Sequence, residues 1–182
     1  MKYRFLSIAL IVILSVGCKN TKTNRTYTKV AADSLVAKIE QYCNTPVQTE
    51  GLVVHICGVS GKKMKLQSKS GAIIKIVPAD SLSRFDRTYN KKRVRVQGVV
   101  KEFRTEKKYV DRIEKGGPLL CHIDHTPCKD IEWVKEKEES GVAEKILKRD
   151  IAKLRKQMQQ TGKDYVSVVT IFAEKVEIIE PL

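Results

Sequence analysis

The chain has 182 residues and a formal net charge of +14, with 35 Lys and Arg against 21 Asp and Glu. Its length is enough for one domain with its own hydrophobic core. The basic balance favours polyanionic partners such as nucleic acid, anionic lipid headgroups or acidic glycans, and surface solubility is the simpler explanation of the same charge.

Residues 1–17 have the pattern of an export signal. Lys2 and Arg4 precede a nearly continuous apolar run that ends at Val16, and small residues come just before Cys18. The run is shorter than the roughly 20 apolar residues of a membrane span. The small residue before Cys18 resembles the lipobox of bacterial lipoproteins, in which the cysteine is diacylated and becomes residue one. This resemblance implies an acylated Cys18 and a mature chain that has lost both basic residues, with a charge of +12.

Residues 18–32 are polar and rich in Lys, Thr and Asn, and we predict that they form a flexible tether. No acidic cluster follows Cys18, whereas similar lipoproteins use acidic residues there for inner-membrane retention or surface export. The resemblance therefore implies a cell-envelope protein that is anchored by lipid at the periplasmic face of the outer membrane. Because that compartment holds little nucleic acid, none is expected as a partner.

Residues 33–182 are predicted to form a single domain. A short helix is expected over "ADSLVAKIEQYCN", where apolar residues recur at helical spacing. Four strands follow, in "GLVVHIC", "KKMKLQS", "GAIIKIVP" and "KKRVRVQGVVKEF", and "ADSLSRFD" is expected to form one or two helical turns before the fourth. In the fourth strand valines alternate with charged residues, and Gly98 indicates a bulge or a sharp bend.

Residues 109–162 are predicted to be helical with loops, and "KDYVSVVTIFAEKVEII" is the final strand. Thr126 is expected to cap a helix whose first residue is Pro127. Four curled strands, a small helix between the third and fourth, and a closing strand match an OB-type barrel. The predicted fold is therefore β-rich α+β, a five-stranded OB-type barrel with a helical insertion at about 109–162 before the last strand.

The stretches "EGLVVHICGVSGKKMKLQSKSGAIIKI" and "RVRVQGVVKE" are similar to small exported OB-fold lipoproteins of Bacteroidota. The shared core of these proteins is a strand that ends in His-x-Cys, a Gly-Lys-Lys turn and a valine-rich strand with Gly-Val. The resemblance covers about 51–102 and implies the OB fold. It implies almost nothing about activity, because a fold by itself does not determine function.

Four basic side chains on the predicted strands alternate away from the apolar positions and form the predicted anion-binding site. They are Lys63, Lys65, Arg93 and Arg95. The second, third and fourth strands have no aromatic residue before Phe103, so a base-stacking platform for single-stranded nucleic acid is missing. We therefore expect a membrane-anchored binding module, without catalysis of its own, that recognises an anionic headgroup, a glycan or an acidic protein. Solvated lysines are the alternative.

Each of the three histidines lies near a cysteine. His55 and Cys57 are two residues apart on a predicted strand, so their side chains share one face. We expect Cys57 to be a small buried side chain. The alternative is a pair of ligands at the end of the strand.

The segment "PLLCHIDHTPCKD" holds two cysteines and the other two histidines. With Cys18 acylated, four thiols remain in an oxidising compartment, and we predict a Cys121–Cys128 disulfide and no cofactor. The alternative is a zinc or copper site from both cysteines with His125 or His122, which would make the chain a metal-binding or thiol-redox protein. A third reading is a reactive Cys128 thiolate at a helix N-terminus.

Overall fold

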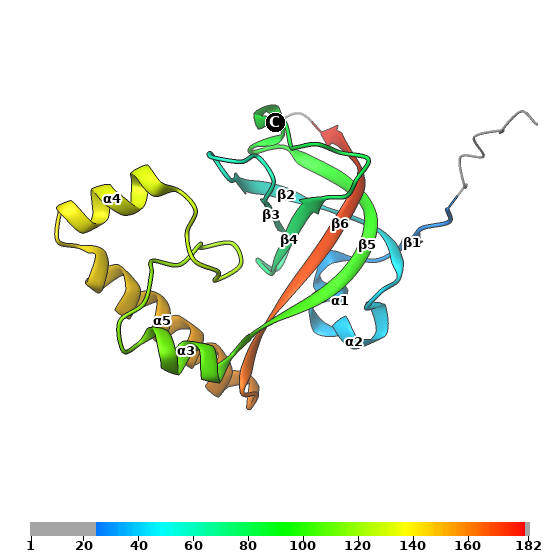
Figure 1. Ribbon diagram of the computed structural model, residues 1–182. Coiled ribbons are helices and arrows are strands. Elements are labelled where there is room, and N and C mark those ends of the chain that lie inside the picture. The colour runs from blue at the N-terminus through cyan, green and yellow to red at the C-terminus, as the bar shows by residue number, and fades with distance from the viewer. Residues whose placement is uncertain (1–24, 181–182) are drawn as a thin grey trace, which may run out of the picture.

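The structure is a computed structural model that describes residues 25–180 (Figure 1). The predicted signal peptide at 1–17 and the acylation site Cys18 lie outside the described residues. None of the helices in the described part of the chain is long and apolar enough to cross a membrane.

Five strands close into a barrel. Their bounds are β2 (Pro46–Ile56), β3 (Met64–Gln67), β4 (Ile73–Pro78), β5 (Arg93–Glu106) and β6 (Tyr165–Glu180). The order around the barrel is β2-β3-β4-β6-β5, and β5 pairs back with β2. Neighbouring strands are antiparallel, except that β4 and β6 are parallel. This topology confirms the predicted five-stranded OB-type barrel.

The N-terminal part of the described chain packs on the barrel. Strand β1 (Thr28–Lys29) pairs in parallel with β2, so the end of the predicted tether is ordered. The predicted first helix is broken into α1 (Ala32–Ala37) and α2 (Ile39–Tyr42). The helical turn between β4 and β5 is the 3-10 helix η1 (Arg87–Tyr89), which lies just after the predicted stretch "ADSLSRFD".

The barrel core follows from period-two alternation. In β5, Val94, Val96 and Val100 are fully buried and Gly98 is buried as well, while the alternating residues 95, 97 and 99 are half-buried. Burial of such side chains contributes roughly 1.5–3 kcal/mol each. Gly98 lies at the predicted bulge, where the register between β5 and β6 shifts. A Cβ there would lie 2.1 Å from the Phe172 carbonyl oxygen, so only glycine permits this close approach of the strands.

The insertion consists of three helices, α3 (Lys107–Ile113), α4 (Ile131–Glu139) and α5 (Ala143–Thr161). Strands β5 and β6 extend beyond the barrel as a two-stranded ribbon that carries these helices (Figure 1). The buried stripe of α5 packs on residues of α3 and of the segment that follows α3, which gives the insertion its own apolar cluster. The main cluster of the barrel is separate from it.

The predicted start of the fourth helix is wrong. Helix α4 begins at Ile131, and the carboxylate of Asp130 caps it by accepting a hydrogen bond from the Trp133 amide at 3.1 Å. Thr126 and Pro127 belong to an antiparallel turn, in which the Thr126 carbonyl accepts a hydrogen bond from the Cys121 amide and Pro127 pairs with Leu120. They therefore do not start a helix. Cys128 is therefore not at a helix N-terminus, and the third reading of this cysteine loses its support.

Candidate functional site

A cavity of about 400 Å³ lies between the barrel and the insertion. One wall is the end of β2 with the β2–β3 loop, residues 55–60 and Lys63. The other wall is formed by residues 120–123, 128–130 and Trp133 of the insertion. In Figure 1 the segment between α3 and α4 folds back from the helices towards β3 and β4. The two Cys/His motifs of the sequence therefore face each other across one cavity.

A tight antiparallel turn shapes the insertion wall. The Cys121 amide donates to the Thr126 carbonyl at 2.7 Å, and the Cys128 amide donates to the Leu119 carbonyl at 2.8 Å. His125, at the tip of this turn, has a left-handed backbone with φ of 59°. The backbone hydrogen bonds of the turn hold both cysteines beside the barrel.

Asp124 joins the insertion to the barrel. Its carboxylate is 2.8 Å from Lys63 Nζ and 2.7 Å from Lys75 Nζ, and its side chain is only 4% exposed. The Thr126 hydroxyl donates to the same carboxylate at 2.8 Å. Burial would raise the pKa of Asp124, but the hydrogen bonds from Lys63, Lys75 and Thr126 outweigh burial and hold this pKa well below 3.8. Asp124 is therefore ionised at neutral pH and neutralises two lysines of the barrel.

His55 of β2 and His122 of the insertion meet beside the cavity. Their ring centroids are 4.4 Å apart and the rings are tilted by 71°, an edge-to-face contact. Burial and the charge of Lys65 lower the pKa of both imidazoles, that of His122 to about 4. Lys65 is the cross-strand neighbour of His55, and burial lowers the pKa of its ammonium as well. These shifts share one cause, an environment that resists additional positive charge.

Three of the four described cysteines line the cavity: Cys57, Cys121 and Cys128. All four are free thiols, so the predicted Cys121–Cys128 disulfide is not formed in this structure. In the turn Cys121 lies across from Thr126 and Cys128 from Leu119, which makes the two cysteines diagonal neighbours. Such neighbours are typically about 7–8 Å apart, beyond the roughly 4.4–6.8 Å between the Cα atoms of a disulfide. Pairing of Cys121 with Cys128 in oxidised protein stays a prediction.

Cys57 lies in the β2–β3 loop among hydrogen-bond donors. The Ser60 hydroxyl is 3.6 Å from its Sγ, and the amides of Val59 and Ser60 donate to the same sulfur. Burial raises the pKa of the Cys57 thiol, but these hydrogen bonds and the charge of Lys63 together outweigh burial, so the pKa lies below 9.0. Burial dominates at Cys121 and raises the pKa of that thiol.

The alternative zinc or copper site is not assembled by the described residues. Between residues 25 and 180, no three His, Cys, Asp or Glu side chains are grouped closely enough to hold a metal ion. His125 does not line the cavity that Cys121 and Cys128 share. Its carbonyl accepts a hydrogen bond from the Tyr109 hydroxyl at 3.3 Å, and burial lowers the pKa of its ring. Metal binding by Cys121, His125 and Cys128 stays a prediction.

The structure divides the four predicted anion-binding residues into two pairs. Lys63 lines the cavity, and Lys65 follows it on β3. Arg93 and Arg95 lie on β5, which is separated from β3 by β2. Arg95 forms an ion pair with Glu50 at 2.9 Å, and Arg93 also has an interaction partner. The lysine pair is therefore the one placed beside the cavity.

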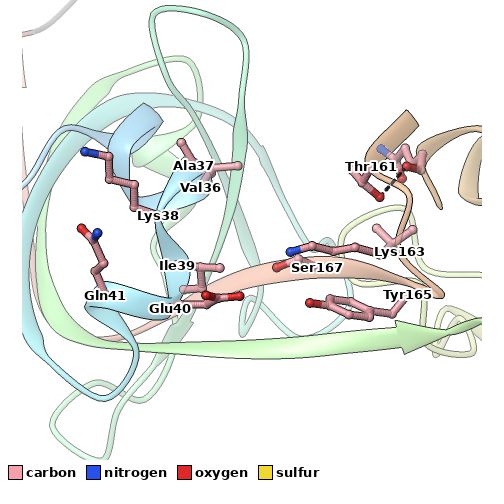
Figure 2. A pocket seen from close by; sticks show the side chains of 12 residues that line it. Val36, Ala37, Lys38, Ile39, Glu40, Gln41, Thr161, Lys163, Tyr165 and Ser167 are labelled. Carbon is pink, nitrogen blue, oxygen red and sulfur yellow. Dashed lines mark hydrogen bonds between the residues drawn. The ribbon is translucent and has the colours of Figure 1, made fainter. Parts of the chain in front are cut away.

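A second hollow, of about 640 Å³, lies between α1–α2 and the junction of α5 with β6. Figure 2 shows Lys38 and Gln41 on its helix side and Lys163 and Tyr165 near that junction. The Lys163 ammonium is 5.4 Å from the centroid of the Tyr165 ring. The residues that line this hollow include no cysteine or histidine. The first cavity, by contrast, is lined by three cysteines and two histidines.

Sequence reasoning missed Asp124, Lys75 and Trp133 as parts of the site. An acidic residue between two histidines, in a chain with this excess of basic residues, is the signal that could have identified Asp124. No comparable signal marks Lys75, which is one of many lysines on alternating strands. Comparison of the chain with protein-family models and with curated proteins gave no match. The functional conclusion therefore rests on the site.

Proposed function

We propose that this protein is a lipid-anchored binding module of the cell envelope, which holds a small ligand with an apolar body and an anionic group in the cavity between barrel and insertion. The cavity is the observation that carries the proposal. Its volume of about 400 Å³ falls within the roughly 300–1,000 Å³ of small-molecule sites. We expect binding without catalysis.

The position of the cavity supports this proposal. In OB folds, ligands bind on barrel strands two and three, between the loop after the first strand and the loop before the last strand. The corresponding elements here are β3 and β4, the β2–β3 loop and the insertion between β5 and β6. Since that loop and that insertion form the two walls of the cavity, the fold presents it where related barrels present their ligands.

The lining supports an amphipathic ligand. Ile56, Ile123 and Trp133 provide apolar surface, and Lys129 provides positive charge. Lys63 also lines the cavity, but its charge is balanced by Asp124. The lining also contains Asp130, whose carboxylate caps α4 and so has a structural role. An apolar wall with a few charged groups is typical of ligand sites. The anionic group is the phosphate or carboxylate of a lipid headgroup, of a glycan or of an acidic side chain that a protein inserts into the cavity.

The proposed location rests on the sequence of residues 1–18, which resembles a lipoprotein signal with its acylated cysteine. The proposed relationship to exported OB-fold lipoproteins rests on residues 51–102. The described chain enters the barrel through β1, on the side away from the insertion (Figure 1). An acyl anchor upstream of β1 would therefore leave the insertion and the cavity directed away from the point of attachment, at the periplasmic face of the outer membrane.

The test uses anilinonaphthalene sulfonate, an aromatic sulfonate, and its uncharged analogue phenylnaphthylamine. Trp133 is the only tryptophan of the chain and lines the cavity, so its fluorescence reports occupancy directly. We expect saturable binding of the sulfonate and weaker binding of the uncharged analogue. Sulfonate binding should weaken from low to physiological salt, because exposed charges are screened beyond about 8–10 Å there.

Three variants distinguish binding in the cavity from binding at other surfaces. Gly58→Phe places a ring at the cavity wall, where a new Cβ meets no heavy atom within 4 Å, and should abolish binding. Ala37→Phe in the second hollow is the matched control and should retain binding. A combined Arg93→Gln and Arg95→Gln variant tests β5. If only this variant loses binding, or if both probes bind equally well, the proposed site or the proposed charge of the ligand is wrong.

A second candidate function is that of a metal-binding or thiol-redox envelope protein. Three thiols and two imidazoles from segments more than 60 residues apart line one cavity, and this convergence favours it. Metal content of the reduced protein, measured with and without Cys121→Ser, tests metal binding. Stoichiometric zinc or copper that depends on Cys121 would support metal binding. Metal-free protein with readily alkylated thiols would contradict metal binding, and only the thiol-redox function would remain.

A further inference from the structure

We propose that Cys57 is a reactive thiol that forms a mixed disulfide with a small aromatic or apolar disulfide held in the cavity. The inference deepens the thiol candidate and does not depend on anion binding. It rests on three features of the site: the fixed loop around Cys57, the access of its sulfur to the cavity, and the apolar walls that would hold the other half of the disulfide.

The β2–β3 loop holds Cys57 from both sides. The Cys57 amide donates to the Lys63 carbonyl at 2.8 Å, and the Gly61 amide donates to the Cys57 carbonyl at 3.0 Å. The loop thereby turns back on itself, and the Ser60 hydroxyl comes to lie 3.6 Å from Cys57 Sγ. The amides of Val59 and Ser60 donate to the same sulfur. Donors of this kind stabilise a thiolate more than a thiol, and the thiolate is the nucleophile.

Cys57 is distinguished from the other two thiols of the cavity. It is half-buried, whereas Cys121 is buried and lies 3.8 Å from the Lys63 ammonium. Cys128 is part of the antiparallel turn, and its amide is bonded across that turn. The remaining titratable groups that line the cavity are Lys63, His55, His122, Lys129 and Asp130. Of these, Lys63 is the cation whose charge favours the Cys57 thiolate.

The reaction is a thiol–disulfide exchange. The Cys57 thiolate attacks one sulfur of the bound disulfide, a new sulfur–sulfur bond forms, and the old one breaks. The second sulfur leaves with the electron pair as a thiolate and takes a proton from water. Cys57 is thus oxidised while the leaving sulfur is reduced, and the disulfide itself is the oxidant. Ile56, Ile123 and Trp133 supply the apolar surface against which the retained group packs.

The experiment uses the reduced, full-length protein and dithiodipyridine, an uncharged aromatic disulfide, so that attraction by lysines does not enter. Peptide mass spectrometry identifies which cysteine carries the adduct at early times. We expect Cys57 to react first, ahead of the half-buried Cys43 outside the cavity, because lowering the pKa of a thiol raises its thiolate fraction by more than it lowers the nucleophilicity of the sulfur. The rate should level off below pH 9.0, the ordinary thiol value.

Two variants of exposed loop residues complete the test. Ser60→Ala removes the hydroxyl donor and should move the midpoint of the pH–rate profile upward, with the rate at pH 7 reduced about two- to fivefold. Ser83→Ala removes a hydroxyl from an exposed residue that does not line the cavity, and it should leave the profile unchanged. Reaction at Cys43 before Cys57, or equal profiles for wild type and Ser60→Ala, would overturn the proposal. Because sulfonate binding is measured separately, failure here leaves the proposed binding function standing.

Discussion

Replacing Asp124 with Asn should lower the free energy of unfolding by about 2–4 kcal/mol. Asn keeps the shape of the side chain but removes the charge that Lys63 and Lys75 contact at 2.8 and 2.7 Å. The lysine side chains are only 22% and 13% exposed, so water replaces the lost partner incompletely. Breaking a buried ion pair from one side costs about 3–5 kcal/mol. Flexible lysines that turn towards water reduce that value.

The pH dependence of this loss has a definite sign. The pKa of Asp124 is depressed in the folded state, so its contribution is fully present above the ordinary value of 3.8 and is lost as the pH falls through the lower, folded value. The difference between wild type and Asp124→Asn should therefore be constant from pH 7 to about 5 and should shrink below about 4. A purely steric effect of the substitution would not follow this window.

Urea unfolding measures the loss with two probes. The fluorescence of Trp133 reports the insertion wall, and far-ultraviolet circular dichroism reports the whole domain. Glu50→Gln is the matched control, because its ion pair with Arg95 is more than a third exposed on both sides and such pairs contribute about 0–1 kcal/mol. A loss for Asp124→Asn no larger than that of the control, or one that persists unchanged below pH 4, would refute the argument.

Four further predictions address the anchor, the barrel and the histidine contact. Cys18→Ala should release the protein from the membrane fraction, and a mature N-terminus beyond Cys18 in mass spectrometry would contradict the lipobox assignment. A chain that ends at Gly162 lacks β6, which pairs with both β4 and β5, so its melt by circular dichroism should lose cooperativity; a native-like melt would show that β6 is peripheral. Gly98→Ala should destabilise the fold by about 1–3 kcal/mol in denaturant, since its Cβ would overlap the Phe172 carbonyl, and an unchanged midpoint would argue against that close approach. Burial lowers the pKa of His122 from 6.5 to about 4, so the unfolded chain binds more protons in that window and stability should fall as the pH drops through it. The effect is moderated by the exposure of the ring, and His122→Gln should reduce the slope of stability against pH.

Local patterns in the sequence were sufficient to predict the barrel. Valines at every second position of β5 predict a half-buried strand, because side chains of a strand point alternately to its two faces. The helical character of the insertion over about 109–162 was predicted from the residues in the same way, and α5 does end at Gly162, which has a left-handed φ of 65°. These signals depend on neighbours along the chain, which is why they could be read without a structure.

The start of α4 shows where local patterns fail. Thr126 followed by Pro127 is a sound capping signal, yet the backbone donors and acceptors of that segment pair across an antiparallel turn instead. Asp130 then supplies the cap for α4. The same turn places Asp124 against Lys63 and Lys75, which lie about 50 residues or more away in the sequence, and no local pattern could reveal these contacts.

By itself, the sequence determined the alternating strands, the helical insertion and the basic character of the chain, because each is a property of residue type and short-range spacing. The export signal is a prediction of the same kind, and residues 1–17, on which it rests, lie outside the described part of the chain. Only the tertiary structure decided that His55 and Cys57 share a cavity with Cys121 and His122. It also decided that Lys63 is neutralised by Asp124 while Arg95 pairs with Glu50. Burial, ion pairing and the pKa of a thiol depend on which distant groups come within a few ångströms, and the closure of the barrel and the folding back of the insertion set those distances.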